Sequence, residues 1–478
     1  MLKRLYKISA LSLLCIISSC SEDRLDIEPQ VDDVYNGYLE SESDMKKATN
    51  GLYTALGSGT NFGASLILYG DLISDNVFQS TAYGGGYYSG ISNFGWYADT
   101  SFGQYRSLYD VVQRANLVIL DNFVPNNENV VSMKGEAKIA RGLAYFYLVQ
   151  LYSSNPTSGN YQEAGIVLKN NKYDPTETNA RSTVDEVYNQ IIKDLTEGVN
   201  EMKSSERTSK TFLSPTAGKL ILAKAHLTRG KSGDYDKAVQ YADEVLTSSP
   251  GSFSVIKASD LKNYFTSTDE KINEEQAETI FEIEQSTSYS LQVNAHLAAF
   301  YSNTGGQRSM LARQWVYSSY DDADLRKGLF NITAAALNDD PKGVWIAKYP
   351  RSVGGNYSGN VKVFRMTEAK YIKMEALAKQ GKGAEALKLL NEHAVERGSK
   401  PYTGDALKAI LLDAQKEFIG EGHRFFDLKR NNLPIDKKEN CLDGTCYQAS
   451  DSKYFVFPIG RSELELNNKM VNHPLWLK

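Results

Sequence analysis

The sequence has few of the residues that metal centres and nucleic-acid interfaces need. Its 478 residues include 4 cysteines and 5 scattered histidines, too few close ligands for a zinc site. Lysine and arginine number 53 against 58 acidic residues, and the resulting net charge of −5 argues against nucleic-acid binding. With 41% hydrophobic and 23% charged residues, the chain is expected to fold around a buried core. We expect neither a metal nor a cofactor.

Aromatic residues are what the sequence has in excess. There are 30 tyrosines, 18 phenylalanines and 4 tryptophans, or 11% of the chain. Tyrosine offers a flat apolar face with a polar tip, which suits stacking on flat ligands. Many of these rings lie in helical stripes and are assigned to the core, for example Tyr145, Tyr147, Tyr188 and Tyr241.

The N-terminus has the pattern of a lipoprotein signal. Residues 1–19 start with basic side chains and continue into an apolar run that is shorter than the about 20 residues needed to cross a bilayer. The sequence Ile-Ser-Ser-Cys that ends at Cys20 resembles a bacterial lipobox, with isoleucine in place of the usual leucine. Glu22 and Asp23 then resemble an acidic signal for export to the cell surface. We therefore expect Cys20 to be lipidated and residues 20–45 to form a tether.

Two cysteines remain beyond the N-terminus. Cys441 and Cys446 are separated by four residues, and in an oxidising compartment this spacing predicts a small disulfide loop. A zinc site would need two further soft ligands.

Apolar residues at helical spacing dominate the rest of the chain and predict a mainly α fold. Three stripes carry the argument, at residues 184–199, 137–151 and 407–418. Thr183 and Glu186 supply a capping box for the first of them.

Two helical hairpins resemble tetratricopeptide units, with small residues where the paired helices meet. They span residues 217–250 and 368–394. Strand candidates are few and short, at residues 279–284 and 454–459. Residues 58–104 and 286–312 have no period and predict long irregular loops, which are usually functional when they occur in a folded chain.

Aromatic residues on these two loops are the candidate ligand-binding residues. Those of the first loop have glycine, serine and asparagine as neighbours, and those of the second lie near polar side chains that can bond hydroxyl groups. The predicted set is Asp75, Asn76, Tyr83, Tyr87, Tyr88, Trp96, Tyr289, Tyr301, Asn303, Arg308 and Trp315. Rings of this kind stack on sugar faces while amide, carboxylate and guanidinium groups bond the hydroxyls. The alternative is that the rings fix the loops to the helical body.

No set of residues predicts catalysis. Ser74-Asp75-Asn76 and Ser43 with Lys46 match two of the three penicillin-binding signatures, but the third is missing. Glu421, Arg424 and Asp427 are spaced as on one helix face, where ion pairing is the simpler explanation. We therefore do not expect an enzyme.

Ordered motifs along most of the chain resemble the SusD/RagB family of Bacteroidetes surface lipoproteins. After the lipobox, residues 25–30 (LDIEPQ) resemble the family's start, and residues 135–148 resemble its GEAKFLRALAYFYL helix. Residues 417–430 match the EFxGEGxRxxDLxR signature, and residues 457–474 match the family's ending.

This resemblance implies a tetratricopeptide-like helical scaffold with long irregular loops and a few short strands. It also implies a non-catalytic protein on the outer membrane that captures oligosaccharides and passes them to a SusC-like TonB-dependent transporter. The expected regions are residues 46–270, with the helical repeats and the aromatic loop, and residues 271–478, the family's C-terminal region. RagB-like capture of oligopeptides, a surface glycosidase and a structural helical adaptor remain the alternatives.

Overall fold

Stacked helical hairpins form the body of the protein. The computed structural model describes residues 39–202, 209–248, 252–332 and 342–477. The expected signal segment, Cys20 and most of the expected tether lie outside these residues. Within the described part, no helix is both long enough and apolar enough to span a membrane.

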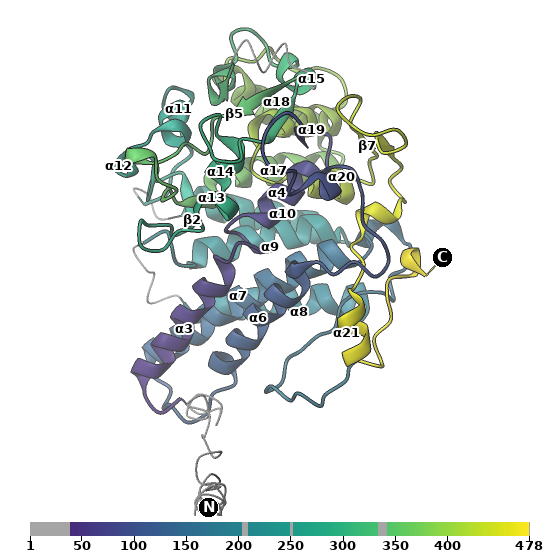
Figure 1. The fold of residues 1–478 in the computed structure, drawn as a ribbon. Helices are drawn as coiled ribbons and strands as arrows, with labels where there is room; N and C mark the ends of the chain where they lie inside the picture. The colour runs from purple at the N-terminus through teal and green to yellow at the C-terminus, as the bar shows by residue number, and fades with distance from the viewer. Residues whose placement is uncertain (1–38, 203–208, 249–251, 333–341, 478) are drawn as a thin grey trace, which may run out of the picture.

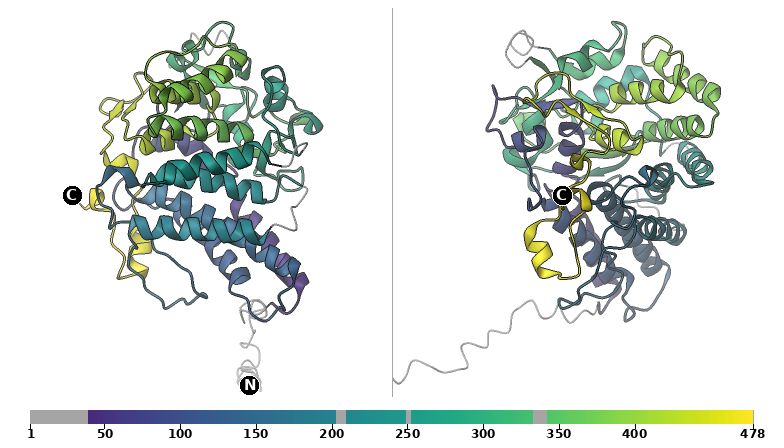
Figure 2. Two further views of the ribbon diagram at one scale, coloured as in Figure 1. Left: turned by 180° about the vertical axis from the view of Figure 1, so that it is seen from behind. Right: turned by 90° about the vertical axis from the view of Figure 1, so that its right-hand side faces the viewer.

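The helices follow one another as antiparallel neighbours, and their stacking is clear from behind in the left view of Figure 2. In chain order, the long helices are α3 (Glu42–Leu56), α6 (Gly103–Ile119), α7 (Glu128–Tyr152), α8 (Val184–Glu201), α9 (Pro215–Arg229), α10 (Asp234–Leu246), α17 (Met366–Lys379), α18 (Gly383–Glu396) and α19 (Ala406–Glu417). Each of the pairs α6/α7, α7/α8, α8/α9, α9/α10, α10/α17, α17/α18 and α18/α19 is in contact. The contact between α10 and α17 joins the two tetratricopeptide-like hairpins into one stack, which confirms the predicted fold class.

Local sequence signals set the bounds of these helices. The predicted capping box is present at the start of α8, where the Thr183 side chain accepts from the Glu186 backbone and the Glu186 side chain accepts in return. Helix α9 begins with Ser214 as cap and Pro215 in its first turn, and ends at Gly230 with φ of 63°. Where α7 meets α8, a Cβ atom on Gly135 would lie 2.9 Å from the carbonyl oxygen of Gly198, so the approach requires glycine.

Irregular segments and short strands lie in front of the stack in the upper part of Figure 1, whereas α3 and α6 face the viewer in the lower part. Four strands form an antiparallel sheet in the order β1 (Val77–Gln79), β3 (Met310–Arg313), β5 (Gly343–Ile346) and β4 (Phe330–Asn331). A second pair joins β2 (Thr279–Ile283) to β6 (Val361–Arg365). Short helices connect these strands: α5 (Ser89–Ser92), α11 (Ala258–Thr266), α12 (Glu270–Asn273), α13 (Gln292–Ala295), α14 (Leu297–Tyr301) and α15 (Gln314–Ser318).

Two sequence expectations about local structure were wrong. The expected loop 58–104 contains a helix, α4 (Ser65–Leu72), which is buried on nearly every face and therefore shows no amphipathic period. The expected strand 454–459 is a short 3-10 turn, Lys453–Phe455, followed by extended chain without a paired strand.

The C-terminal signature also differs from a continuous helix. Helix α19 ends at Glu417, the chain turns through Gly420 and Gly422 with φ of 84° and 76°, and α20 (Arg424–Arg430) follows. Glu421 lies in this turn and bonds Lys348 and Arg365, so it does not share a helix face with Arg424. The prediction that the three residues pair with one another on one helix face was therefore wrong: Arg424 pairs with Asp75, and Asp427 pairs with Arg430 of its own helix.

Candidate functional site

Three segments without any charged side chain come together on the side covered by the loops. These are residues 76–98, 285–307 and 352–361, and none contains aspartate, glutamate, lysine or arginine. Ser80 donates its backbone N–H to the Ser309 carbonyl at 2.8 Å, and Gly306 donates to the Tyr357 hydroxyl at 2.9 Å. We call the surface formed by these three segments the uncharged face.

Tyr83 lies at the centre of the contacts between the first two segments. Its ring packs on the indole of Trp345 with centroids 5.1 Å apart, and the guanidinium carbon of Arg308 lies 5.8 Å from its centroid. The indole N–H of Trp345 donates to the Arg308 carbonyl at 3.3 Å. Trp345 is buried on β5, in register with Leu311 on β3, so the sheet fixes the position of the Tyr83 ring.

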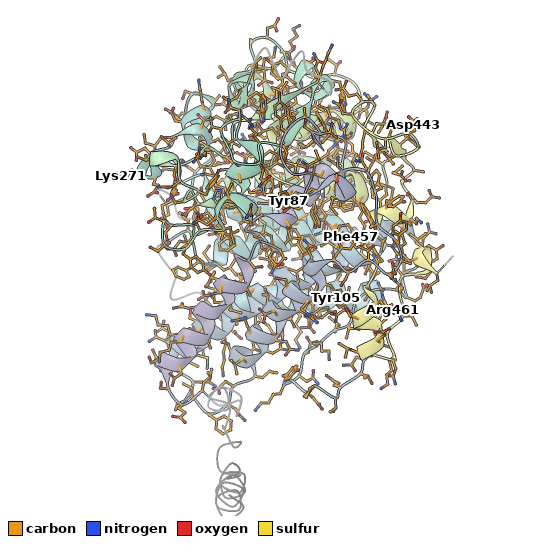
Figure 3. All side chains as sticks on the ribbon, in the orientation of Figure 1. Tyr87, Tyr105, Lys271, Asp443, Phe457 and Arg461 are labelled. Atoms are coloured by element: carbon orange, nitrogen blue, oxygen red, sulfur yellow. A yellow bond between two sulfur atoms is a disulfide. The ribbon has the colours of Figure 1, made fainter. Side chains whose placement is uncertain are left out.

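Tyr87 and Tyr88 are held by glycine turns and by one buried ring. A Cβ atom on Gly84 would lie 2.5 Å from the Gln307 carbonyl, and φ at Gly84 is 71°, so glycine is required there. The rings of Tyr87 and Tyr88 lie 6.5 Å and 5.2 Å from Phe300 on α14. Tyr87 is 60% exposed, whereas Tyr88 is half-buried and burial raises its pKa. Tyr87 is labelled in Figure 3.

Polar groups and one more exposed ring lie on the second segment. Tyr289 is 55% exposed at a turn in which its backbone exchanges two hydrogen bonds with Ser286. Asn303 is half-buried and accepts from the Asn331 amide at 3.3 Å. Gln307 accepts from Gly85 N–H at 3.4 Å. Of the predicted set, the structure therefore brings Tyr83, Tyr87, Tyr88 and Arg308 together. Tyr289 and Asn303 lie on the second segment, which ends next to Arg308.

Trp96 is a correction to the predicted set. It is 3% exposed, and its ring packs against Phe102, Tyr454 and Phe457 at centroid distances of 5.7, 5.1 and 5.9 Å. Its polar sequence neighbours do not expose it, because the C-terminal segment covers it. Trp96 is therefore a core residue.

Tyr301 is also buried and does not reach a ligand from solvent. Its hydroxyl donates to the Asp71 carboxylate at 3.2 Å, and its ring stacks on Tyr349 at 5.3 Å. Burial raises the pKa of Asp71 to about 7, against the opposing bonds from Gly422 N–H and Tyr301. This pair connects α4 with α14 inside the protein.

Asp75 and Asn76, at the start of the first segment, form hydrogen bonds with residues in and near the C-terminal signature. Both side chains are buried, at 5% and 1% exposure. Arg424 donates to both Asp75 oxygens at 2.8 and 3.0 Å, and the Gln415 amide donates to Asn76 at 2.8 Å. These two residues are corrections as well, since their polar atoms are used in the core.

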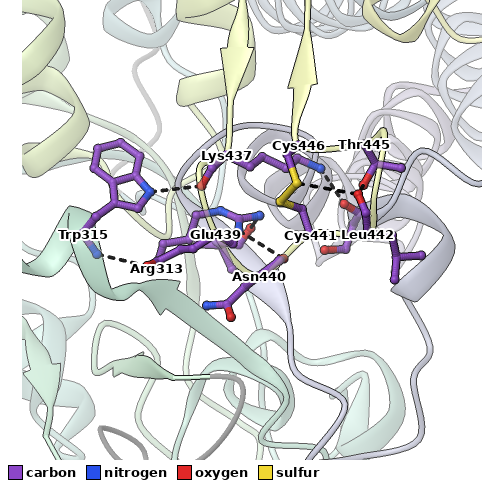
Figure 4. The surroundings of a disulfide bond; sticks show 11 residues. Arg313, Trp315, Lys437, Glu439, Asn440, Cys441, Leu442, Thr445 and Cys446 are labelled. Atoms are coloured by element: carbon purple, nitrogen blue, oxygen red, sulfur yellow. Dashed lines mark hydrogen bonds between the residues drawn. A yellow bond between two sulfur atoms is a disulfide. The ribbon is translucent and has the colours of Figure 1, made fainter.

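Trp315 holds a hairpin that closes with the predicted disulfide (Figure 4). Its indole N–H donates to the Lys437 carbonyl at 3.2 Å, and the Lys438 ammonium lies 4.1 Å above its ring. Strands β7 (Ile435–Asp436) and β8 (Tyr447–Gln448) pair, and Cys441 is bonded to Cys446 between them. The half-buried Trp315 thus has a packing role in the structure.

Replacing Cys441 and Cys446 by serine is expected to reduce stability by about 2 kcal/mol, because the short cross-link restricts the unfolded chain. Denaturant unfolding of the oxidised protein and the double serine variant measures this difference. Under reducing conditions the two proteins should become equally stable. A difference that persists with reductant would contradict the cross-link as its cause.

Sequence reasoning missed Trp345, Phe300 and Gln307, which support the exposed tyrosines. Trp345 lies on a strand that was not predicted, and Phe300 lies on a short helix inside an expected loop. The signal that could have found this surface is the absence of charge from three separate segments. Among the residues that the structure describes, no group of three or more histidine, cysteine and acidic side chains is arranged to hold a metal.

A stack of helical hairpins with an aromatic, uncharged surface defines a helical-repeat binding protein. Residues 23–227 match the family profile described as "Starch-binding associating with outer membrane", and residues 260–476 match the profile described as "SusD family". The two matches together run through most of the chain, so the chain belongs to the SusD family, as the sequence motifs indicated.

Solved structures share this fold at low sequence identity. A SusD superfamily protein from Bacteroides vulgatus has a TM-score of 0.82 and 23% identity, over 92% of this chain and 100% of that one. A SusD-like carbohydrate binding protein from the same species has a TM-score of 0.77 and 21% identity, over 90% and 98%. Surface glycan-binding protein A from Bacteroides thetaiotaomicron has a TM-score of 0.72 and 16% identity, over 91% and 100%. No curated protein matches this sequence.

Proposed function

We propose that the protein binds glycans at the cell surface through the uncharged face, without chemical change to the ligand. The observation that carries this proposal is that exposed tyrosine rings and amide groups come together on segments that contain no acidic residue of their own. Tyr83, Tyr87 and Tyr289 offer ring faces to the C–H groups of a sugar. Asn303 and Gln307 offer amide groups to its hydroxyls.

Membrane attachment and transport are further parts of this proposal. The lipobox at Cys20 and the acids after it support a lipid anchor on the outside of the outer membrane. Membership of the SusD family supports a SusC-like TonB-dependent transporter as the partner that receives the glycan. Mass spectrometry of the N-terminal peptide would test lipidation, and co-purification from native membranes would test the partner.

Oligopeptide capture and glycan hydrolysis are the competing functions. Incubation with polysaccharides followed by product analysis separates binding from hydrolysis, because a binding protein releases no new reducing ends. A peptide library tested beside the polysaccharides separates the two ligand classes.

Replacing Tyr87 with alanine is expected to weaken glycan binding about tenfold, or ~1.4 kcal/mol, because it removes an exposed ring of the uncharged face. The measurement is affinity electrophoresis with a panel of neutral and anionic polysaccharides. Tyr447→Ala is the matched control, since Tyr447 is 58% exposed on β8 next to the disulfide. Equal affinities of the two variants for the bound glycan would remove Tyr87 from the site.

A further inference from the structure

Two arginines border the uncharged face. Arg308 directly follows the segment 285–307, and Arg351 directly precedes the segment 352–361. The chain as a whole is acidic, with a net charge of −5. The residues that border the three segments thus include two arginines beside the exposed acids Asp99 and Glu284, and Arg308 is the one that lies against the Tyr83 ring.

The backbone of Arg308 is fixed while its side chain is exposed. Its N–H donates to the Ala299 carbonyl at 2.8 Å, and its own carbonyl accepts from Trp345 at 3.3 Å. Its guanidinium lies beside Tyr83 and forms no salt bridge with a carboxylate of the described residues. Other arginines of the protein are used differently: Arg424 and Arg430, for example, are buried against Asp75 and Glu375.

Arg351 contacts the turn of residues 304–308, which ends at Arg308. Its Nη1 donates to the Thr304 carbonyl at 3.2 Å, and its guanidinium lies 5.0 Å from the Tyr357 centroid. Tyr357 in turn accepts from Gly306 N–H. The Nε atom of Arg351 is buried and has no hydrogen-bond partner among the described residues. Both arginines are thus attached to the same turn, residues 304–308, and neither is neutralised by a carboxylate there.

We infer that the glycan bound at the uncharged face carries anionic groups, the carboxylates of uronic acids or sulfate esters, and that Arg308 recognises them. This inference rests on the proposed glycan-binding function. A guanidinium group presents a planar pair of donors that matches the oxygens of a carboxylate or sulfate. The Tyr83 ring beside it would pack on the sugar that carries the anionic group. Tyr83 and Arg308 would then recognise the sugar ring and its anionic group at the same place.

The test compares anionic and neutral polymers on the full protein and three variants. The probes are polygalacturonate and alginate for carboxylates, dextran sulfate for sulfate, starch and dextran as neutral glycans, and poly-glutamate as an anionic peptide. Arg308→Gln removes the charge and Arg308→Lys keeps it without the paired donors. Arg461→Gln is the matched control, because Arg461 is an exposed arginine on α21 (Arg461–Leu466), away from Tyr87 in Figure 3.

We expect binding to the carboxylated or the sulfated polymer, a loss of about tenfold or more in Arg308→Gln, a smaller loss in Arg308→Lys and no change in Arg461→Gln. The two anionic arms distinguish uronate from sulfate. Binding of neutral glycans alone, with Arg308→Gln equal to the unmodified protein, would overturn the inference and leave the proposed function standing. Binding of poly-glutamate alone, or of no polymer, would overturn both. Thermal unfolding of each variant confirms that it is folded.

Discussion

Replacing Trp96 with alanine is expected to lower the free energy of unfolding by about 3–5 kcal/mol, the usual cost of truncating a large buried aromatic side chain. Trp96 is 3% exposed and joins the segment 76–98 to Tyr454 and Phe457 near the C-terminus. Its removal leaves a cavity where two parts of the chain far apart in sequence meet. Denaturant unfolding followed by circular dichroism measures the difference.

The neighbouring residue supplies the control for this prediction. Tyr97 is 73% exposed, and Tyr97→Ala should change stability by less than about 0.5 kcal/mol. If Trp96→Ala were as stable as the unmodified protein but had lost glycan binding, Trp96 would belong to the ligand site after all. A loss of both stability and binding that is restored at lower temperature would agree with the core assignment.

Trp96 also shows why the binding residues were harder to predict than the fold. The helices could be predicted because an apolar stripe and its cap are local features of the sequence. The helical spacing of apolar residues from Val184 onward and the capping box at Thr183 are enough to place α8. Whether a ring on a glycine-rich segment is exposed depends on what distant chain covers it. Tyr87 and Trp96 have similar polar neighbours in sequence, yet one is 60% exposed and the other 3%.

The polar residues of the predicted site were also hard to assign, because their partners lie far away in the sequence. Asp75 was a reasonable candidate for bonding sugar hydroxyls, because it precedes the aromatic segment. Its partner Arg424 lies 349 positions away and belongs to the family's C-terminal signature. The pairing explains why this motif contains an arginine, and no local pattern around Asp75 indicates it.

The excess of tyrosine thus divides into structural and exposed rings. Tyr145 and Tyr188 are fully buried, as their helical spacing predicted, and Tyr301 joins them through a contact that the sequence does not indicate. The rings on the uncharged face that are exposed or partly exposed include Tyr83, Tyr87, Tyr88, Tyr97 and Tyr289. On the uncharged face, the few tyrosine rings that pack against Trp345 and Phe300 are enough to form the proposed binding site. The buried tyrosines stabilise the scaffold that carries this face.

Replacing Arg365 with methionine is expected to lower the stability at pH 7 by about 3–5 kcal/mol or more, because it leaves buried carboxylates without their partner. Arg365 is fully buried and bonds Glu421 at 2.7 Å, Glu417 at 3.0 Å and Glu278 at 3.2 Å. Burial alone would raise the pKa of Glu417, but Arg397 and Arg365 hold it well below its usual value. Burial opposes Arg365 and Lys348 in the same way at Glu421, whose pKa is also lowered.

The pH dependence of this variant distinguishes loss of charge pairing from loss of packing. In the unmodified protein, the lowered pKa values of Glu417 and Glu421 mean that their contribution to stability is present above the unfolded pKa of about 4.3 and is lost as the pH falls below it. Without Arg365 the pKa values of Glu417, Glu421 and Glu278 are higher than in the unmodified protein. These carboxylates therefore take up protons earlier in the folded variant as the pH falls, and the variant then loses less stability than the unmodified protein. The stability difference between the two proteins should therefore shrink from pH 7 to about pH 4.5, as measured by urea unfolding at each pH. Arg461→Met, which removes an exposed arginine paired with Glu465, should leave the stability almost unchanged at every pH. A difference for Arg365→Met that is constant with pH would mean that the side chain acts through its packing volume alone.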